Sequence, residues 1–140
     1  MASRLIIALA VVAVAVVAAK LLERRRPAPP TRDAYPVPAQ LDRLDFPRPE
    51  APWLFVLFSS RTCDSCRPMV ERVCALESET VATIPVEAKA DKALHDRDRI
   101  EGVPMVVLAD SHGVVRAGWV GATESWELEE ALDKARSEPA

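Results

Sequence analysis

The hydrophobic positions begin with a long apolar stretch at the N-terminus. From Leu5 to Ala19 every residue is apolar, and Leu21 and Leu22 follow directly after Lys20. An α-helix over these residues measures roughly 27 Å, close to the thickness of the hydrocarbon core of a bilayer. A surface helix of this length would carry a polar stripe, and this one has none. The pattern therefore predicts a single membrane-spanning helix over residues 5–22.

The residues that flank this segment bear on its processing and orientation. The small residues in "VVAAK" also fit a signal peptide that is cleaved, but the basic run "KLLERRR" fits a stop-transfer flank better. The C-terminal flank carries Lys20 and Arg24–Arg26, against Arg4 alone on the other side. The positive-inside rule thus favours a single-pass cell-membrane protein with its remaining residues on the cytoplasmic face, while an extracytoplasmic placement stays open.

A proline-rich region follows the basic flank. Eight of the twelve prolines lie between Pro27 and Pro52, and such a composition favours a stiff, extended spacer. Residues 39–46, "AQLDRLDF", could form a short helix at the entrance of the domain. We therefore divide the chain into an anchor with its basic flank (1–26), a spacer and domain entrance (27–50) and a folded domain (51–138).

In the folded domain, continuous apolar runs alternate with helical periods. The run "WLFVLF" is typical of a strand that is buried on both faces. The pattern predicts, in order, a strand at 53–58, a helix at 63–77, a strand at 81–88, a short polar helix at 91–100, strands at 103–109 and 114–121, and a helix at 123–136. Strands that alternate with helices imply parallel pairing, and the late hairpin adds an antiparallel edge. The expected fold class is α/β, with a central mixed sheet flanked by helices.

The two longer helices each show a face expected to be buried. In the first, this face consists of Cys66, Met69, Val70, Val73 and Leu76, and in the second of Leu128, Ala131, Leu132 and Ala135. We expect Thr123 to cap the N-terminus of the second helix.

The charge balance bears on the kinds of partner. Five of the 18 basic residues but only one of the 21 acidic residues lie in the first thirty, so the remainder carries 13 basic against 20 acidic residues. An acidic domain with no basic stripe repels phosphate backbones, which argues against nucleic acid as a partner.

The candidate chemistry lies in "TCDSC", directly after the first buried strand. Such a cysteine pair can be a redox couple, half of a metal site or a structural disulfide. We expect Cys63 in the first turn of the helix, where unpaired N–H groups and the helix dipole lower a thiol pKa from about 8.5. Cys66 lies one turn further on, within disulfide reach, and as the more buried thiol it would resolve a mixed disulfide.

Pro52 to Arg136 resembles the thioredoxin family in the order and spacing of its elements. The resemblance rests on "TCDSC" after the apolar strand, on "RIEGVPMVVLADSHGVV" and on "GWVGATESWELEEAL". It implies a thioredoxin-like fold and thiol–disulfide oxidoreductase activity, with Cys63 as the attacking and Cys66 as the resolving cysteine. It also implies a cis peptide bond before Pro104, with Val103 offering its backbone to an extended substrate, and no cofactor besides the redox-active disulfide.

The chain also departs from the family pattern. The typical "WCGPC" is "TCDSC" here, and Leu57 stands where reductases of the family often bury an acid, so proton transfer would have to use water. Asp64 disfavours a nearby thiolate, whereas Arg61 and Arg67 favour it. The opening strand and helix of the family are poorly represented.

Other polar and aromatic residues have simpler interpretations. Cys74, His95 and His112 are the remaining soft metal ligands and show no paired spacing, which disfavours a closed zinc site. We expect Cys74 to pack as a small apolar side chain and both histidines to face solvent. Trp53, Trp119 and Trp126 are expected to pack against the core, although Trp119 could be exposed in its hairpin.

The sequence thus favours a membrane-tethered, monomeric thiol–disulfide oxidoreductase that serves cell redox homeostasis. Its expected partners are protein disulfide substrates and an electron donor or acceptor that the sequence does not identify, and reduction is favoured over oxidation. Two alternatives stay open: a module that binds or delivers a soft metal such as copper, and a non-redox scaffold that docks a membrane partner.

Overall fold

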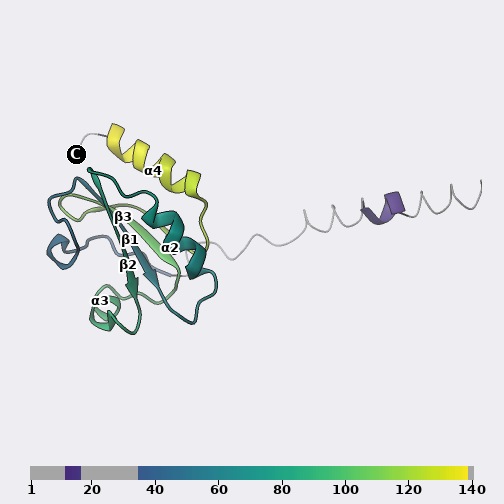
Figure 1. Ribbon diagram of the computed structural model, residues 1–140, viewed down its shortest axis with the longest axis horizontal. Helices are drawn as coiled ribbons and strands as arrows, with labels where there is room; N and C mark the ends of the chain where they lie inside the picture. Colours follow the sequence, from purple (N-terminus) through teal and green to yellow (C-terminus); the bar gives the residue numbers. More distant parts are fainter. Residues whose placement is uncertain (1–11, 17–34, 139–140) are drawn as a thin grey trace, which may run out of the picture. The chain divides into compact units, whose positions relative to one another are not determined.

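The computed structural model describes residues 12–16 and 35–138 of the chain (Figure 1). The chain divides into two units, Met1–Thr31 and Arg32–Ala140. Of the first unit only residues 12–16 are described, and they are helical. The rest of the predicted span 5–22 lies outside the described residues, and within those described no helix is both long and apolar enough to cross a membrane.

The second unit is built on a four-stranded mixed sheet in the order β2-β1-β3-β4. The strands are β1 (Trp53–Ser59), β2 (Val81–Glu87), β3 (Met105–Asp110) and β4 (Val115–Val120). β1 pairs in parallel with β2 and antiparallel with β3, and β3 pairs antiparallel with β4. The predicted mixed sheet with an antiparallel edge is therefore confirmed.

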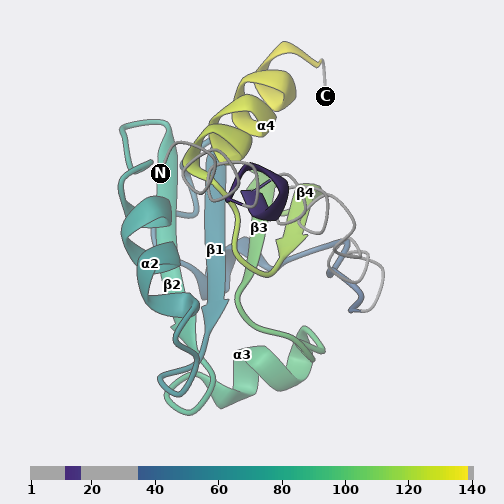
Figure 2. The same ribbon diagram turned by 90° about the vertical axis from the view of Figure 1, so that its right-hand side faces the viewer.

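Helices cover both faces of this sheet (Figures 1 and 2). α2 (Cys66–Cys74) and α4 (Ser125–Ser137) pack on one face, against a core that includes Phe55, Leu57 and Val106. The other face is covered by α3 (Lys92–Arg97) and by the segment that precedes β1. β1 is central, so its side chains Leu54 to Phe58 are all fully buried, as the continuous apolar run predicts.

The segment that precedes β1 is part of the folded unit. Leu41, Phe46 and Ala51 are buried in the core, and a short 3-10 helix, η2 (Arg43–Asp45), lies between them. The Leu41 N–H donates to the Gly113 carbonyl at 2.8 Å, which ties the segment to the hairpin that joins β3 and β4. The packed region therefore starts before residue 51, because the proline-rich stretch contributes its own apolar side chains to the sheet.

The first predicted helix is shorter than expected and begins at Cys66 rather than Cys63. Pro68 explains this start. A proline has no N–H, and its ring clashes with the carbonyl four residues earlier inside a helix, so it is tolerated only in the first turn. Starting at Cys66 makes Pro68 the third helical residue, where the N–H would be unpaired in any case.

The expected cap of the last helix is also wrong. Glu124, not Thr123, occupies the N-cap position, and Thr123 is 2% exposed. The Thr123 hydroxyl donates to the Gly121 carbonyl at 3.3 Å, so its side chain serves the preceding turn instead of the helix. The predicted buried faces of both helices are confirmed, with Met69, Val73, Leu128 and Leu132 in the core.

Candidate active site

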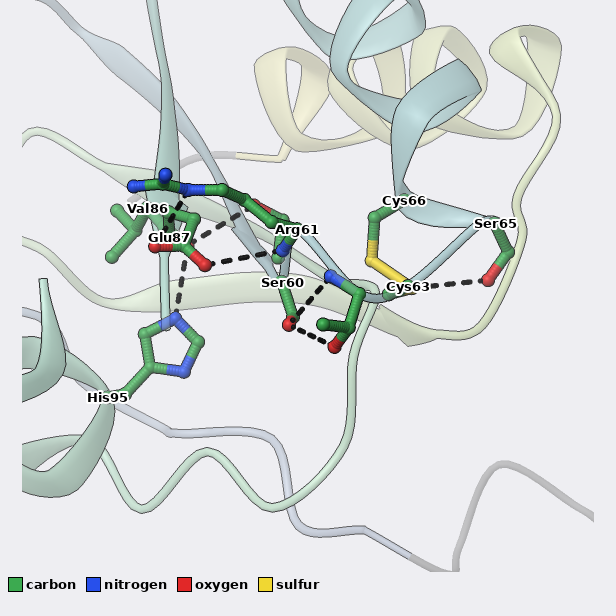
Figure 3. The surroundings of a disulfide bond; sticks show 10 residues. Ser60, Arg61, Cys63, Ser65, Cys66, Val86, Glu87 and His95 are labelled. Carbon is green, nitrogen blue, oxygen red and sulfur yellow. Dashed lines mark hydrogen bonds and ion pairs between the residues drawn. A yellow bond between two sulfur atoms is a disulfide. The ribbon is translucent and has the colours of Figure 1, made fainter. Parts of the chain in front are cut away.

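The two cysteines of "TCDSC" form a disulfide where β1 leads into α2 (Figure 3). Their Cα atoms are 5.4 Å apart. Cys63 is half-buried in the turn before the helix, so its predicted first-turn placement is wrong. Cys66 is the first residue of α2 and is 2% exposed. The pair thus has one sulfur that a partner can reach and one that lies beneath the surface.

Hydrogen bonds within the turn fix the reachable cysteine. The Cys63 N–H donates to the Ser60 carbonyl at 3.1 Å, and the Cys66 N–H donates to the Cys63 carbonyl at 3.2 Å. The Ser65 hydroxyl lies 3.4 Å from the Cys63 sulfur, which carries no hydrogen in the disulfide, so the hydroxyl is the donor (Figure 3). A donor at this position also stabilises a thiolate on the same atom.

A carboxylate from the neighbouring strand anchors the start of this turn. Glu87, the last residue of β2, is the register partner of Ser59. Its side chain accepts hydrogen bonds from the backbone N–H groups of Arg61, Lys89 and Ala90, at 3.2, 3.0 and 2.9 Å. It also pairs with the Arg61 guanidinium at 3.7 Å. The N–H of Ala90 has the largest effect on the Glu87 pKa and, with the other donors, holds it below its usual range despite partial burial.

A pocket of about 390 Å³ opens beside the disulfide, on the β2 side of β1. Cys63 and Cys66 line it together with Val70, Pro85 and Arg67. Val70 and Pro85 contribute apolar side chains to its lining. Arg67 is exposed, and no hydrogen bond or ion pair joins its side chain to another described residue.

The Val103–Pro104 segment lies at the start of β3, on the other side of β1. The peptide bond between these residues is cis, as the family resemblance implies. Met105 is the register partner of Phe58, so Pro104 comes to the end of β1 from which the cysteine turn departs. Val103 is half-buried and Pro104 is buried, and the Pro104 carbonyl accepts from the Gly121 N–H at 2.8 Å.

Leu57, which the sequence marks as a departure from the family pattern, lies in β1. It is fully buried and belongs to the same apolar cluster as Phe55, Met69 and Val73. An apolar side chain therefore stands at this position, and the passage of the Cys66 proton to water stays a prediction.

Three expectations about other side chains are wrong. His95 is buried rather than solvent-facing: its Nε2 donates to the Val86 carbonyl at 3.0 Å, and its ring lies edge-on to Phe58. Cys74 is exposed at the end of α2 rather than packed, and Trp126 is 61% exposed. Trp119 packs against the core at 7% exposed. Within the described ranges no group of three or more His, Cys, Asp or Glu side chains could hold a metal ion.

Ser65 and Glu87 are the site residues that sequence reasoning missed. Ser65 follows from the motif itself, because a hydroxyl two residues after Cys63 can turn back to its sulfur. Glu87 follows from topology, because the carboxyl ends of paired parallel strands meet at one edge of a sheet. Its position at the end of the strand next to β1 was the available signal.

Solved structures share the fold described above. One, reported as the structure of a malarial protein, is 14% identical and aligns over 59% of this chain and 96% of its own, with a TM-score of 0.55. Another, a mutant thioredoxin from Halobacterium salinarum NRC-1, is 20% identical over 65% of this chain and 80% of its own, with a TM-score of 0.54. No family model and no curated protein matches the chain. The fold is thioredoxin-like, and the Cys63–Cys66 disulfide lies within it where β1 leads into α2.

Proposed function

We propose that this chain is a membrane-tethered thiol–disulfide oxidoreductase that exchanges disulfides with protein substrates and works chiefly as a reductase. One observation carries the proposal. In a thioredoxin-like fold, the Cys63–Cys66 disulfide presents a half-exposed sulfur to partners and keeps a buried sulfur directly behind it. Disulfide exchange needs this division between an attacking and a resolving thiol.

The reaction runs through two exchange steps. In the reduced protein the Cys63 thiolate attacks one sulfur of a substrate disulfide, forming a mixed disulfide and releasing the other substrate sulfur as a thiolate. The Cys66 thiol gives its proton to water, and its sulfur then attacks the Cys63 sulfur. This step releases the second substrate thiolate and leaves the Cys63–Cys66 disulfide, so two electrons have passed to the substrate. An external dithiol reverses both steps and restores the reduced pair.

The substrate backbone would lie along the start of β3. Val103 precedes the cis bond and is half-buried. Its backbone N–H and carbonyl groups could therefore pair with an extended substrate peptide near Cys63. Pro104 contributes its rigid ring but no N–H donor. A substrate bound in this way would lie on the β3 side of β1, whereas the pocket lined by Val70 and Pro85 opens on the β2 side.

The tether and the direction of electron flow rest on the sequence. The apolar segment 5–22 would anchor the chain, and its flanking charge favours the cytoplasmic face. Cytosolic thiols are kept reduced, and a dithiol protein in that compartment acts as a reductase. A domain with excess acidic residues that is tethered in this way would meet substrates at or near the membrane surface.

Trapping of the mixed disulfide tests this function. Cys66→Ser removes the resolving thiol, so the variant should accumulate covalent adducts with substrate proteins through Cys63. These adducts should disappear on reduction. The matched control Cys63→Ser leaves only the buried sulfur and should trap nothing. If Cys66→Ser forms no more adducts than this control, in a Cys74→Ser background that removes the exposed third thiol, the proposed exchange is refuted.

A further inference from the structure

Glu87, the last residue of β2, contacts the turn of residues 60–66 that contains the two cysteines. Its carboxylate holds the turn through the Arg61 N–H and holds the Arg61 side chain through an ion pair. The same carboxylate accepts the Lys89 and Ala90 N–H groups of the turn after β2. It therefore joins two neighbouring turns, and it is only 19% exposed.

This contact decides where the Arg61 charge lies. The Arg61 guanidinium points toward Glu87 and away from the two sulfur atoms (Figure 3). Its side chain is 76% exposed, so packing does not hold it in this position. The sequence suggests that Arg61 favours the Cys63 thiolate, but in the structure its guanidinium is paired with Glu87.

We propose that Glu87 is a positioning residue that withholds the Arg61 charge from Cys63 and thereby limits the acidity and reactivity of the attacking thiol. This inference rests on the proposed function, because it concerns the same Cys63. It adds a control of the thiol that comes from the neighbouring strand and not from the cysteine motif.

The other charged groups around Cys63 leave room for this effect. Asp64 and Arg67, on either side of Ser65 and Cys66, are exposed and opposite in charge, and both keep their charge in every variant of the test below. β1 brings no charged side chain to this end, and Pro104 from β3 brings none either. The Asp91 carboxylate, which accepts from the Glu87 N–H at 3.1 Å, is likewise unchanged in every variant, so the test isolates the Arg61–Glu87 pair.

The contacts of Glu87 keep its carboxylate ionised, and so keep the Arg61–Glu87 ion pair formed, at neutral pH. Three backbone N–H donors and the Arg61 charge favour the carboxylate over the carboxylic acid, so Glu87 stays ionised at neutral pH. Opening the pair therefore requires a substitution or strong acid and does not happen through an ordinary change of pH.

The test measures the pKa of Cys63 in the reduced full-length chain. All variants carry Cys74→Ser, because the exposed Cys74 would also react. The rate of alkylation by iodoacetamide is followed from pH 5 to pH 10, and modification at Cys63 is counted by peptide mass. Alkylation needs no protein substrate, so it measures the Cys63 pKa even if the protein exchanges no disulfide with a substrate.

Glu87→Gln removes the charge and keeps an acceptor oxygen of similar shape. We expect the Cys63 pKa to fall by about half a unit, which raises the alkylation rate about threefold below the pKa. Glu79→Gln, at the opposite end of β2, removes an equal charge far from the cysteines and should leave the rate unchanged. An unchanged or raised pKa in Glu87→Gln would overturn the proposal, whatever its effect on thermal stability.

A double-mutant cycle with Arg61→Gln isolates the contribution of Arg61. Under the proposal Arg61→Gln has little effect beside an intact Glu87, but it removes most of the pKa fall that Glu87→Gln causes. If instead Arg61→Gln has the same effect in both backgrounds, Arg61 is not withheld by Glu87 and the inference is wrong. The unfolding temperature of each variant is measured on the same samples. A lower unfolding temperature without a lower Cys63 pKa would mean that Glu87 acts only as a structural contact, which would contradict the inference.

Discussion

Removal of the Ser65 hydroxyl should make Cys63 a weaker acid. In the structure this hydroxyl donates to the Cys63 sulfur at 3.4 Å. On reduction the same donor faces the atom that becomes the thiolate. Ser65→Ala removes one oxygen from an exposed side chain, so we expect no change in the fold.

The size of the effect follows from the exposure of this hydrogen bond and from its sulfur acceptor. A hydrogen bond to a charged group contributes about 1.5–3 kcal/mol. Ser65 is exposed, Cys63 is half-buried, and sulfur is a weaker acceptor than oxygen, so we assign about a third of that value, about 0.7 kcal/mol. Since one pKa unit corresponds to about 1.4 kcal/mol, the Cys63 pKa should rise by about half a unit.

The assay is the pH dependence of Cys63 alkylation in a reduced Cys74→Ser background. Below the pKa, Ser65→Ala should react about threefold more slowly, because the thiolate fraction falls with the shift. Ser60→Ala is the matched control: the Ser60 hydroxyl contacts the Thr62 side chain and backbone and no sulfur. A Cys63 pKa that is unchanged or lower in Ser65→Ala would show that the hydroxyl does not stabilise the thiolate.

Two further predictions concern the scaffold that holds the site. Arg43→Met removes the buried guanidinium that donates to the carbonyls of Arg48, Ala51 and Asp110 at 3.0 Å each. We expect it to lower the free energy of unfolding by about 3 kcal/mol in urea titrations, and a loss under about 1 kcal/mol would contradict the role assigned to these bonds. Burial raises the pKa of Asp110, but Arg116 and two backbone N–H groups outweigh it and hold that pKa below its usual range. The stability that Asp110 contributes is therefore present above its unfolded pKa, about 3.9, and is lost as the pH falls through the lower folded value. The difference in unfolding temperature between the wild type and Asp110→Asn should be constant near pH 7 and shrink below about pH 4; a difference that grows in acid would reverse the sign of this argument.

Local sequence patterns predicted the helices and strands well where the periodicity of a single segment shows which of its side chains are buried. The run from Leu54 to Phe58 could only be a strand with both faces covered, and its central position in the sheet confirms this. The face of α2 that contains Met69 and Val73 was likewise visible as a helical period. The start of α2 was also encoded locally, in Pro68, but the apolar period alone extended the helix too far.

The prediction failed where burial depends on contacts distant in sequence. His95 lies in a short polar helix that has too few apolar residues to show which face is buried. It is buried because Phe58 and the Val86 carbonyl meet it from two strands. Glu87 reaches the cysteine turn only through the register of β2 on β1, which no single segment reveals. The cysteine pair itself needed no such contact, since three residues of spacing already place both sulfurs within reach.

The redox equilibrium of Cys63 and Cys66 tests the central claim most directly. The full chain is equilibrated in glutathione buffers of increasing oxidising strength, then alkylated, and the fraction of paired Cys63 and Cys66 is read by mass. The account predicts a single two-electron transition with a potential near or below about −250 mV, as for reductases of disulfides. A transition near about −120 mV would contradict the proposed direction of electron flow, and the absence of any Cys63–Cys66 pairing across the range would contradict the redox function itself.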